Sequence, residues 1–345
     1  MINSIGPKDP AYNPLLEDRF QRPENWKESY IEGRDGYALR TGTLKSTFNS
    51  KAHVLMAVGL GEFIEKYYEL ARNIVERGMD FTIYDPAGQG LSDPLLTASN
   101  QKPPLQHLDD YNRSIENLVR VCHTLDREVQ MNKPVILLGH STGGLTAKLA
   151  AQRHPDLFDA LMLTAPLSGG LAHGMLAGNE SFFARLPVPG FIRKKGIYHP
   201  KTMPVFPGKI KNPDDPEEAH LVRLSNDPVR NKVALKWLAH RKELHKGPAT
   251  YGWFHEQCKA ISECQRQEKH QALALPSVLA IGGKDELVDN LRLYKQGLAM
   301  PNCKMIDFPF ASHELLMEKD PVRNDLLDAL DDLADQVSAP RAMPG

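Results

Sequence analysis

The sequence has few of the features that mark specialised protein classes. Its 345 residues include no CxxC pair and only four cysteines, at positions 122, 258, 264 and 303. No recognised zinc spacing relates His255, Cys258, Cys264 and His270, so we expect reduced, mostly buried thiols rather than metal ligands or disulfides. The 42 basic and 43 acidic residues give a net charge of −1, which excludes a general attraction to nucleic acid.

Long apolar stretches are also missing. The longest apolar runs are the size of a strand, such as residues 54–58, whereas a membrane-spanning helix needs about 18 to 20 apolar residues. The first 20 residues carry acidic side chains and three prolines where a secretory signal needs a basic start and an apolar run. We therefore expect a cytoplasmic protein, with peripheral contact to the inner membrane as the open alternative.

The sequence does contain a regular alternation of strand and helix patterns. Apolar residues predict strands at 37–44, 53–58, 81–84, 135–138, 160–163, 277–281 and 304–308. Helical spacing occurs at 62–77, 108–125, 142–153 and 322–337. Parallel strands need helical crossovers, and bare apolar strands need cover on both faces, so the pattern predicts a doubly wound, mostly parallel α/β fold.

This alternation stops after Pro166 and resumes near residue 273. The intervening stretch has helical and loop-like patterns and nine prolines between positions 187 and 248. About 100 residues between two strands of one sheet are too many for a passive connection. We therefore predict a core at 31–167 and 273–338, a helical cap at 168–272, and a surface arm at 1–30.

The strongest chemical signal is the segment Gly139-His-Ser-Thr-Gly-Gly144, which lies between a predicted strand and a predicted helix. So tight a turn forces its middle residue into a strained conformation, and the flanking glycines prevent backbone clashes. The hydroxyl of Ser141 would then project at a helix N-terminus as a nucleophile. An Asp at this position would indicate dehalogenase or epoxide hydrolase chemistry, which the serine excludes.

A serine hydroxyl needs a base to remove its proton, and that base needs a third group to fix its tautomer. Asp285 and His313 each follow a predicted strand, so they should reach the same edge of the sheet as Ser141. Asp289 and the adjacent Glu286 are alternatives to Asp285, which we favour because it comes first in the loop. We expect His313 to act as general acid and base.

Acyl transfer also needs hydrogen-bond donors for the oxyanion of the tetrahedral intermediate. One predicted donor is the backbone N–H of Thr142, the residue after the nucleophile. The second is the backbone N–H of Leu60, because Gly59 and Gly61 allow the chain to turn toward Ser141 after the strand at 53–58.

Several motifs together resemble one family. Gly59-Leu-Gly-Glu-Phe63, Lys66-Tyr-Tyr-Glu-Leu-Ala71, Asp85-Pro-Ala-Gly-Gln-Gly-Leu-Ser92 and Gly139-His-Ser-Thr-Gly-Gly144 are similar, in order and spacing, to motifs of the bacterial lysophospholipase and monoacylglycerol lipase (serine aminopeptidase-like) family. The resemblance covers about residues 36–335 and is weakest in the cap. It implies an α/β-hydrolase fold, a triad of Ser141, Asp285 and His313, oxyanion donors at Leu60 and Thr142, and no cofactor or metal.

The predicted cap concentrates positive charge. Residues 168–250 contain 14 basic and 7 acidic side chains, a net +7, with the densest run at Arg193, Lys194 and Lys195. A basic cap suits anionic lipid headgroups or a membrane surface, although a solvated charged face is an equal alternative. Candidate acyl-binding aromatics are Phe182, Phe183, Trp253 and Phe254, for which core packing is the alternative.

Three functions remain compatible with these residues. The first is a serine ester hydrolase acting on a lipid monoester, either a lysophospholipid or a monoacylglycerol. The second is a carboxylesterase or amidase for small soluble substrates, which the triad alone does not exclude. The third is a noncatalytic ligand receptor on the same fold. The sequence leaves the oligomeric state open.

Overall fold

The computed structural model describes residues 12–47, 50–96, 104–125, 133–169, 179–197, 224–266 and 273–338. These residues form one eight-stranded sheet with the order β1-β2-β4-β3-β5-β6-β7-β8. The strands are β1 (Lys27–Glu32), β2 (Ala38–Leu44), β3 (Ala52–Ala57), β4 (Met79–Tyr84), β5 (Val135–His140), β6 (Ala160–Thr164), β7 (Ser277–Gly282) and β8 (Cys303–Phe308). All neighbouring pairs from β4 to β8 are parallel, whereas β2 pairs antiparallel with β1 and β4, so the predicted doubly wound fold is confirmed.

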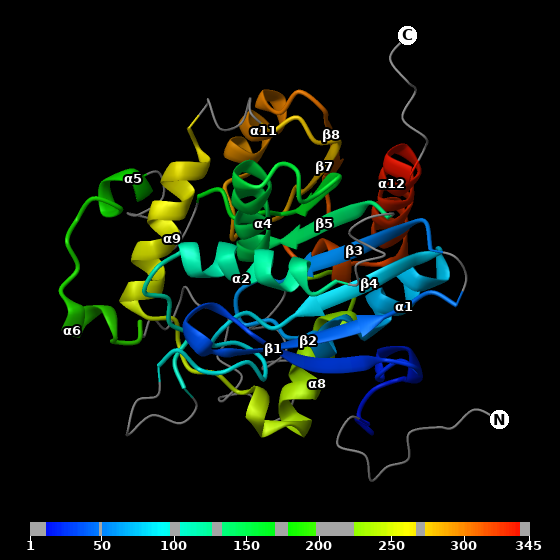
Figure 1. The fold of residues 1–345 in the computed structure, drawn as a ribbon, viewed down its shortest axis with the longest axis horizontal. Helices are drawn as coiled ribbons and strands as arrows, with labels where there is room; N and C mark the ends of the chain where they lie inside the picture. Colours follow the sequence, from blue (N-terminus) through cyan, green and yellow to red (C-terminus); the bar gives the residue numbers. More distant parts are fainter. Residues whose placement is uncertain are drawn as a thin grey trace.

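Helices cover both faces of the sheet (Figure 1). The α-helices are α1 (Tyr68–Glu76), α2 (Asn112–His123), α4 (Ser141–Arg153), α5 (Glu180–Phe183), α6 (Gly190–Arg193), α8 (Val233–His240), α9 (Tyr251–Cys264), α11 (Asn290–Ala299) and α12 (Asp320–Ser338). Short 3-10 helices are η1 (Asp18–Phe20), η2 (Arg34–Gly36), η3 (Ile64–Tyr67), η5 (Arg230–Lys232), η6 (Lys242–Leu244) and η7 (Leu315–Met317). Within the described ranges, no helix combines the length and apolarity that a membrane span needs.

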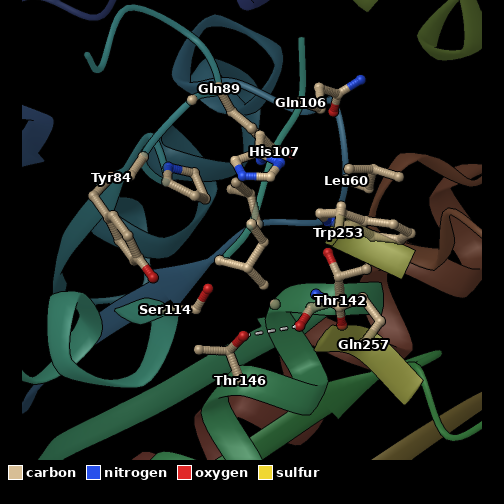
Figure 2. A pocket seen from close by; sticks show the side chains of 16 residues that line it. Leu60, Tyr84, Gln89, Gln106, His107, Ser114, Thr142, Thr146, Trp253 and Gln257 are labelled. Carbon is tan, nitrogen blue, oxygen red and sulfur yellow. Dashed lines mark hydrogen bonds between the residues drawn. The ribbon is translucent and has the colours of Figure 1, made fainter. Parts of the chain in front are cut away.

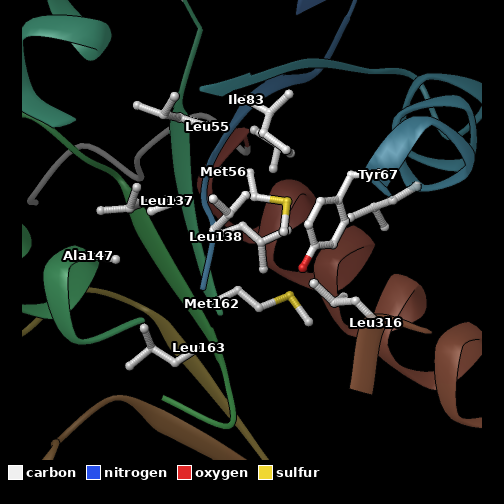
Figure 3. Close-up of a cluster of buried hydrophobic side chains, with 14 of the residues drawn as sticks. Leu55, Met56, Tyr67, Ile83, Leu137, Leu138, Ala147, Met162, Leu163 and Leu316 are labelled. Carbon is white, nitrogen blue, oxygen red and sulfur yellow. The ribbon is translucent and has the colours of Figure 1, made fainter. Parts of the chain in front are cut away.

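The central strands are buried on both faces, as expected for parallel strands between helical layers. Figure 3 shows how successive residues alternate between the two layers. Met56, Leu138 and Met162 are paired in register across β3, β5 and β6, and they face Tyr67 and Leu316. Their neighbours on the strands face the opposite layer, where Ala147 of α4 packs. The sheet is therefore a rigid support for the loops at its carboxyl edge.

Three parallel strands end where the predicted catalytic residues begin. β5 ends at His140, directly before Ser141, and β7 ends three residues before Asp285. β8 ends five residues before His313. β5 and β7 lie on either side of β6, and β8 is the next strand after β7. Because these strands are parallel, the three loops emerge from one edge of the sheet, the edge at which open α/β sheets bind ligands.

Two local predictions differ from the structure. The segment predicted as a surface arm ends in β1, and it buries Phe20 and Trp26 in the main core. The helix predicted over 62–77 begins as η3 and becomes α-helical at Tyr68. β1 was missed because its residues are almost all exposed, so no apolar alternation marks them.

The described parts of the predicted cap attach to the body in different ways. α8 belongs to the main hydrophobic core, where Trp237 is fully buried and its ring lies 5.8 Å from that of Tyr68. Arg230, just before α8, forms a buried ion pair with Glu69 of α1 at 2.7 Å, and it also pairs with the exposed Asp320 of α12 at 2.6 Å. α5, α6 and α9 lie together along another side of the molecule (Figure 1). The boundaries of the cap stay a prediction.

Candidate active site

Ser141 lies at a strained turn between β5 and α4. Its φ angle is +52°, in the left-handed region that residues other than glycine rarely adopt. The chain packs tightly around this turn, which is possible because Gly143 has no Cβ; a Cβ there would lie 2.2 Å from the carbonyl oxygen of Ala57. The strain projects the hydroxyl beyond the sheet at the N-terminus of α4, as the Gly139–Gly144 motif predicts.

The structure places Ser141, His313 and Asp285 in one hydrogen-bonded chain. His313 Nε2 lies 2.9 Å from Ser141 Oγ, and His313 Nδ1 lies 2.6 Å from Asp285 Oδ2. The other oxygen, Asp285 Oδ1, accepts the backbone N–H groups of Leu287 and Val288 at 2.7 and 3.2 Å. The Asp285 side chain is fully buried and that of His313 is nearly so, so the contact between them is shielded from water.

The two alternative acidic residues lie elsewhere. Asp289 is the N-cap of α11, and its Oδ1 accepts the backbone N–H of Arg292 at 3.2 Å. Its Oδ2 also lies 3.2 Å from Nε of the Arg292 side chain. Glu286 is exposed. Of the three candidates, Asp285 is the one that contacts His313.

The Gly59–Gly61 loop is held from two sides beside Ser141. The N–H of Gly59 donates to Glu62 Oε2 at 2.5 Å, and its carbonyl accepts from Gln89 Nε2 at 3.0 Å. The N–H of Gly61 donates to Gln89 Oε1 at 2.6 Å. The N–H of Leu60, between them, donates no hydrogen bond within the described part of the chain.

Thr142 offers a similar donor. As the second residue of α4, it has no helical carbonyl four residues back to which its N–H can donate. Leu60 and Thr142 both line a single small cavity, which agrees with their N–H groups facing a common space (Figure 2). Two such donors, one of them at the N-terminus of α4, suit a negatively charged oxygen.

That cavity, of about 50 Å³, extends from the Gly59–Gly61 loop to α4 and α9. The polar side chains that line it include those of Gln89, Gln106, His107, Ser114 and Gln257 (Figure 2). Burial lowers the pKa of His107, so it is neutral at pH 7, and its Nδ1 lies 2.8 Å from Thr250 Oγ1.

The predicted aromatic residues occupy different environments. Trp253 lines the cavity and packs in a small cluster with Leu108 and Ala249. Phe183 stacks edge-on between Phe182 and Phe254, outside the lining of the cavity. Phe182 itself is 60% exposed.

The thiols are placed as predicted. Cys122, Cys258 and Cys264 are buried, Cys303 is partly buried, and none of these four described cysteines forms a disulfide. Burial raises the pKa of Cys122 and of Cys258 to about 12, which keeps both protonated. In the described ranges no group of His, Cys, Asp and Glu side chains is arranged to hold a metal ion, and His270 lies outside those ranges.

Two groups near the site were not identified as functional from the sequence. Gln89 holds the Gly59–Gly61 loop, and Glu62 and Lys66 lie buried beneath it. All three lie within the motifs that carry the family resemblance, so the signal was present, but sequence spacing does not show which loop a polar side chain supports.

The site combines a serine at a strained strand-to-helix turn with a histidine and an aspartate, joined by hydrogen bonds at the carboxyl edge of a mostly parallel sheet. This combination defines an α/β-hydrolase-fold serine hydrolase. The model of the family described as "serine aminopeptidase, S33" matches residues 49–320. The chain therefore belongs to that family.

Named relatives and solved structures agree with this assignment. The chain is 27% identical to lysophospholipase L2 of Escherichia coli K12 over 338 residues, covering 95% of this chain and 92% of the relative. It is 30% identical to human monoglyceride lipase over 145 residues, 40% of this chain and 42% of the relative. Its fold is similar to a soluble variant of Saccharomyces cerevisiae monoglyceride lipase, with a TM-score of 0.67 at 15% identity, covering 91% of this chain and 96% of that one.

Proposed function

We propose that this serine ester hydrolase cleaves the acyl ester of a lipid monoester, either a lysophospholipid or a monoacylglycerol, through an acyl-enzyme on Ser141. The observation that carries the proposal is the chain of hydrogen bonds from Ser141 through His313 to Asp285. The substrate class is supported by relatives named lysophospholipase and monoglyceride lipase, the first of which matches nearly the whole chain.

The mechanism follows from the atoms in contact. Ser141 Oγ attacks the ester carbonyl while His313 Nε2 removes its proton, and Asp285 holds the imidazole in the tautomer that accepts this proton. The backbone N–H groups of Leu60 and Thr142 stabilise the oxyanion. His313 then protonates the leaving alcohol, and it activates a water molecule that releases the fatty acid and restores Ser141.

A substrate panel tests this proposal. Lysophospholipids, monoacylglycerols and p-nitrophenyl esters of increasing chain length are supplied to the wild-type enzyme and to Ser141→Ala. We expect hydrolysis of the long-chain lipid monoesters by the wild type, and loss of that activity in the variant. Activity confined to acetate and butyrate esters would favour the small-ester carboxylesterase instead. Equally slow turnover by both proteins, without labelling of Ser141 by a fluorophosphonate, would favour the noncatalytic receptor.

The cap, proposed at 168–272, supplies a surface for contact with an anionic membrane. On α5 and α6, Phe182 and Phe191 are 60% and 70% exposed, close in sequence to the basic residues Arg185, Lys194 and Lys195. Lys195 Nζ lies 5.8 Å from the ring centre of Phe191. Exposed aromatic rings beside basic side chains suit the boundary of an anionic bilayer.

Arg193, in contrast, does not belong to this surface. Its guanidinium pairs with Glu256 at 2.7 Å and contacts His255 Nδ1 at 2.9 Å, so it ties α6 to α9. The proposed location is the cytoplasm, with peripheral contact to the inner membrane through α5 and α6.

Flotation with lipid vesicles tests the membrane contact. We expect the protein to bind vesicles that contain phosphatidylglycerol more than vesicles of phosphatidylcholine alone, and salt to weaken the binding. Phe191→Ser should reduce binding. Leu298→Ser is the matched control, because Leu298 is 77% exposed on α11. Equal loss in both variants, or no preference for the anionic vesicles, would contradict the contact.

A further inference from the structure

A buried cluster of charged residues lies beside the proposed triad and takes no part in the mechanism above. Lys66 Nζ lies 2.6 Å from Glu62 Oε1 and 2.6 Å from Glu314 Oε1. The three side chains are 3%, 8% and 12% exposed. The hydroxyl of Tyr67 also bonds to Glu62, so the cluster is closely packed as well as charged.

Each carboxylate of this cluster belongs to a different functional loop. Glu62 Oε2 accepts the N–H of Gly59, the first residue of the Gly59–Gly61 loop. Glu314 directly follows His313 in the chain, and its own N–H is fixed on the carbonyl of Leu224. The ammonium of Lys66 therefore joins the loop that presents one proposed oxyanion donor to the loop that presents the proposed general base.

Glu62 and Lys66 are charged at neutral pH. Burial would raise the pKa of Glu62, but Lys66 and then His140 outweigh burial and lower it to about 2. Burial would lower the pKa of Lys66, but Glu314 and Glu62 outweigh it and raise that pKa. His140, whose Nε2 is 3.8 Å from Glu62, has its pKa lowered to about 4 by burial and stays neutral. Lys66 is thus the cation that balances the two carboxylates.

This arrangement does not suit a substrate-binding role for Lys66. Its ammonium already bonds to two carboxylates and is closed to solvent, so it is not free to bind a lipid phosphate. A buried ion pair is also weak support for stability, because the cost of desolvating the charges offsets much of their attraction. What the cluster does provide is a fixed distance between two loops whose relative position sets the geometry of the reaction.

We propose that Lys66 is a positioning residue that, through Glu62 and Glu314, holds the Gly59–Gly61 loop and the His313 loop in register with Ser141. The inference rests on the proposed function, since it concerns the same site. Breaking the link lets the oxyanion donor and the base move relative to each other. Transition-state stabilisation then falls, while binding of the ground-state ester is largely unchanged.

Variants at Glu314 test the link while the ion pair of Lys66 with Glu62 stays in place. Glu314→Ala breaks the bridge but leaves the Lys66–Glu62 pair intact, and we expect kcat to fall by about tenfold to a hundredfold with little change in KM. Glu314→Gln keeps an acceptor for Lys66 and should recover most of that loss. Lys66→Met leaves two unbalanced buried carboxylates and should lower kcat at least as far, provided that it folds.

Arg230→Met is the matched control for lost stability. Arg230 is as buried as Lys66 and pairs with three carboxylates, those of Glu69, Asp227 and Asp320, none of which adjoins a triad residue or the Gly59–Gly61 loop. We expect this variant to lose stability and keep the wild-type kcat per folded molecule.

Three results would overturn the inference: wild-type kcat in Glu314→Ala, a loss confined to KM, or an equal fall of kcat in Arg230→Met. All rates are measured on the ester that the wild type hydrolyses fastest and are compared with Ser141→Ala. If the wild type does not exceed Ser141→Ala on any ester, the proposed function fails and the inference fails with it. If the wild type is active and the Glu314 variants have the same kcat as the wild type, the positioning role alone is wrong.

Discussion

Substituting Asp285 by asparagine tests the assignment of the third triad residue, because the structure fixes how the new amide must lie. Asp285 Oδ1 accepts two backbone N–H groups, from Leu287 and Val288. The oxygen of an asparagine would keep these donors, so its NH₂ group would point at His313 Nδ1, which now lies 2.6 Å from Asp285 Oδ2. His313 Nδ1 must then accept a hydrogen bond instead of donating one.

The consequence for the reaction is a wrong tautomer. With Nδ1 as acceptor, the proton of the neutral imidazole sits on Nε2, which faces Ser141 Oγ at 2.9 Å and can no longer remove its proton. Loss of the correct tautomer in a triad lowers kcat by about 10⁴. At about 1.36 kcal/mol per tenfold change, this is about 5.4 kcal/mol of lost transition-state stabilisation.

The assay is steady-state hydrolysis of a long-chain ester by Asp285→Asn, with Ser141→Ala as the background. Asp289→Asn is the matched control, because asparagine caps a helix about as well as aspartate does and α11 should keep its N-cap. We expect near wild-type kcat in the control. If Asp285→Asn keeps more than about a tenth of the wild-type kcat, far from the 10⁴ loss of a broken triad, the tautomer argument is refuted. If Asp289→Asn loses activity instead, the assignment of Asp285 is wrong.

Three further predictions concern packing and charge. Gly143→Ala should cost at least about 3 kcal/mol of stability or prevent folding, measured by urea denaturation, since its Cβ would meet two carbonyl oxygens at 2.2 and 2.4 Å. Arg230→Met should lower the free energy of unfolding by about 3 kcal/mol, because the buried carboxylate of Glu69 loses its two bonds to the guanidinium, at 2.7 and 2.9 Å; a fall below about 1 kcal/mol would contradict this. The pKa of Glu62 is lowered from 4.5 to about 2, so its stabilising effect should be present above about pH 4.5 and lost as the pH falls toward 2. The slope of melting temperature against pH in that window should be smaller in Glu62→Gln than in the wild type. An unchanged slope would contradict a stabilising role of the Glu62 charge.

The fold and the position of the proposed nucleophile could be predicted from the sequence because their signals are local. Val135–Leu138 is a bare apolar strand, and the glycines around Ser141 define the turn that follows it. Asp285 and Asp289 could not be separated in this way, because both lie in the loop after β7 and only its three-dimensional path directs one toward His313.

The parts that escaped prediction depend on contacts between distant segments. Lys66 and Glu314 are 248 positions apart in the chain, yet their side chains meet at 2.6 Å. The cavity combines side chains from several separate segments, and no single segment carries a pattern that marks it. β1 is a polar edge strand, which pairs through its backbone and therefore needs no apolar alternation.

The placement of Trp237 limits how this enzyme could be recombined with its relatives. A helical insertion that touched only the mouth of the site could be exchanged as a module to transfer substrate preference. Here α8, in the middle of the proposed cap, fills part of the main core and is fixed by the ion pairs of Arg230. Replacing residues 168–272 as one block would open a cavity in the body, so a chimera should retain residues 224–244 and exchange only the segments on either side.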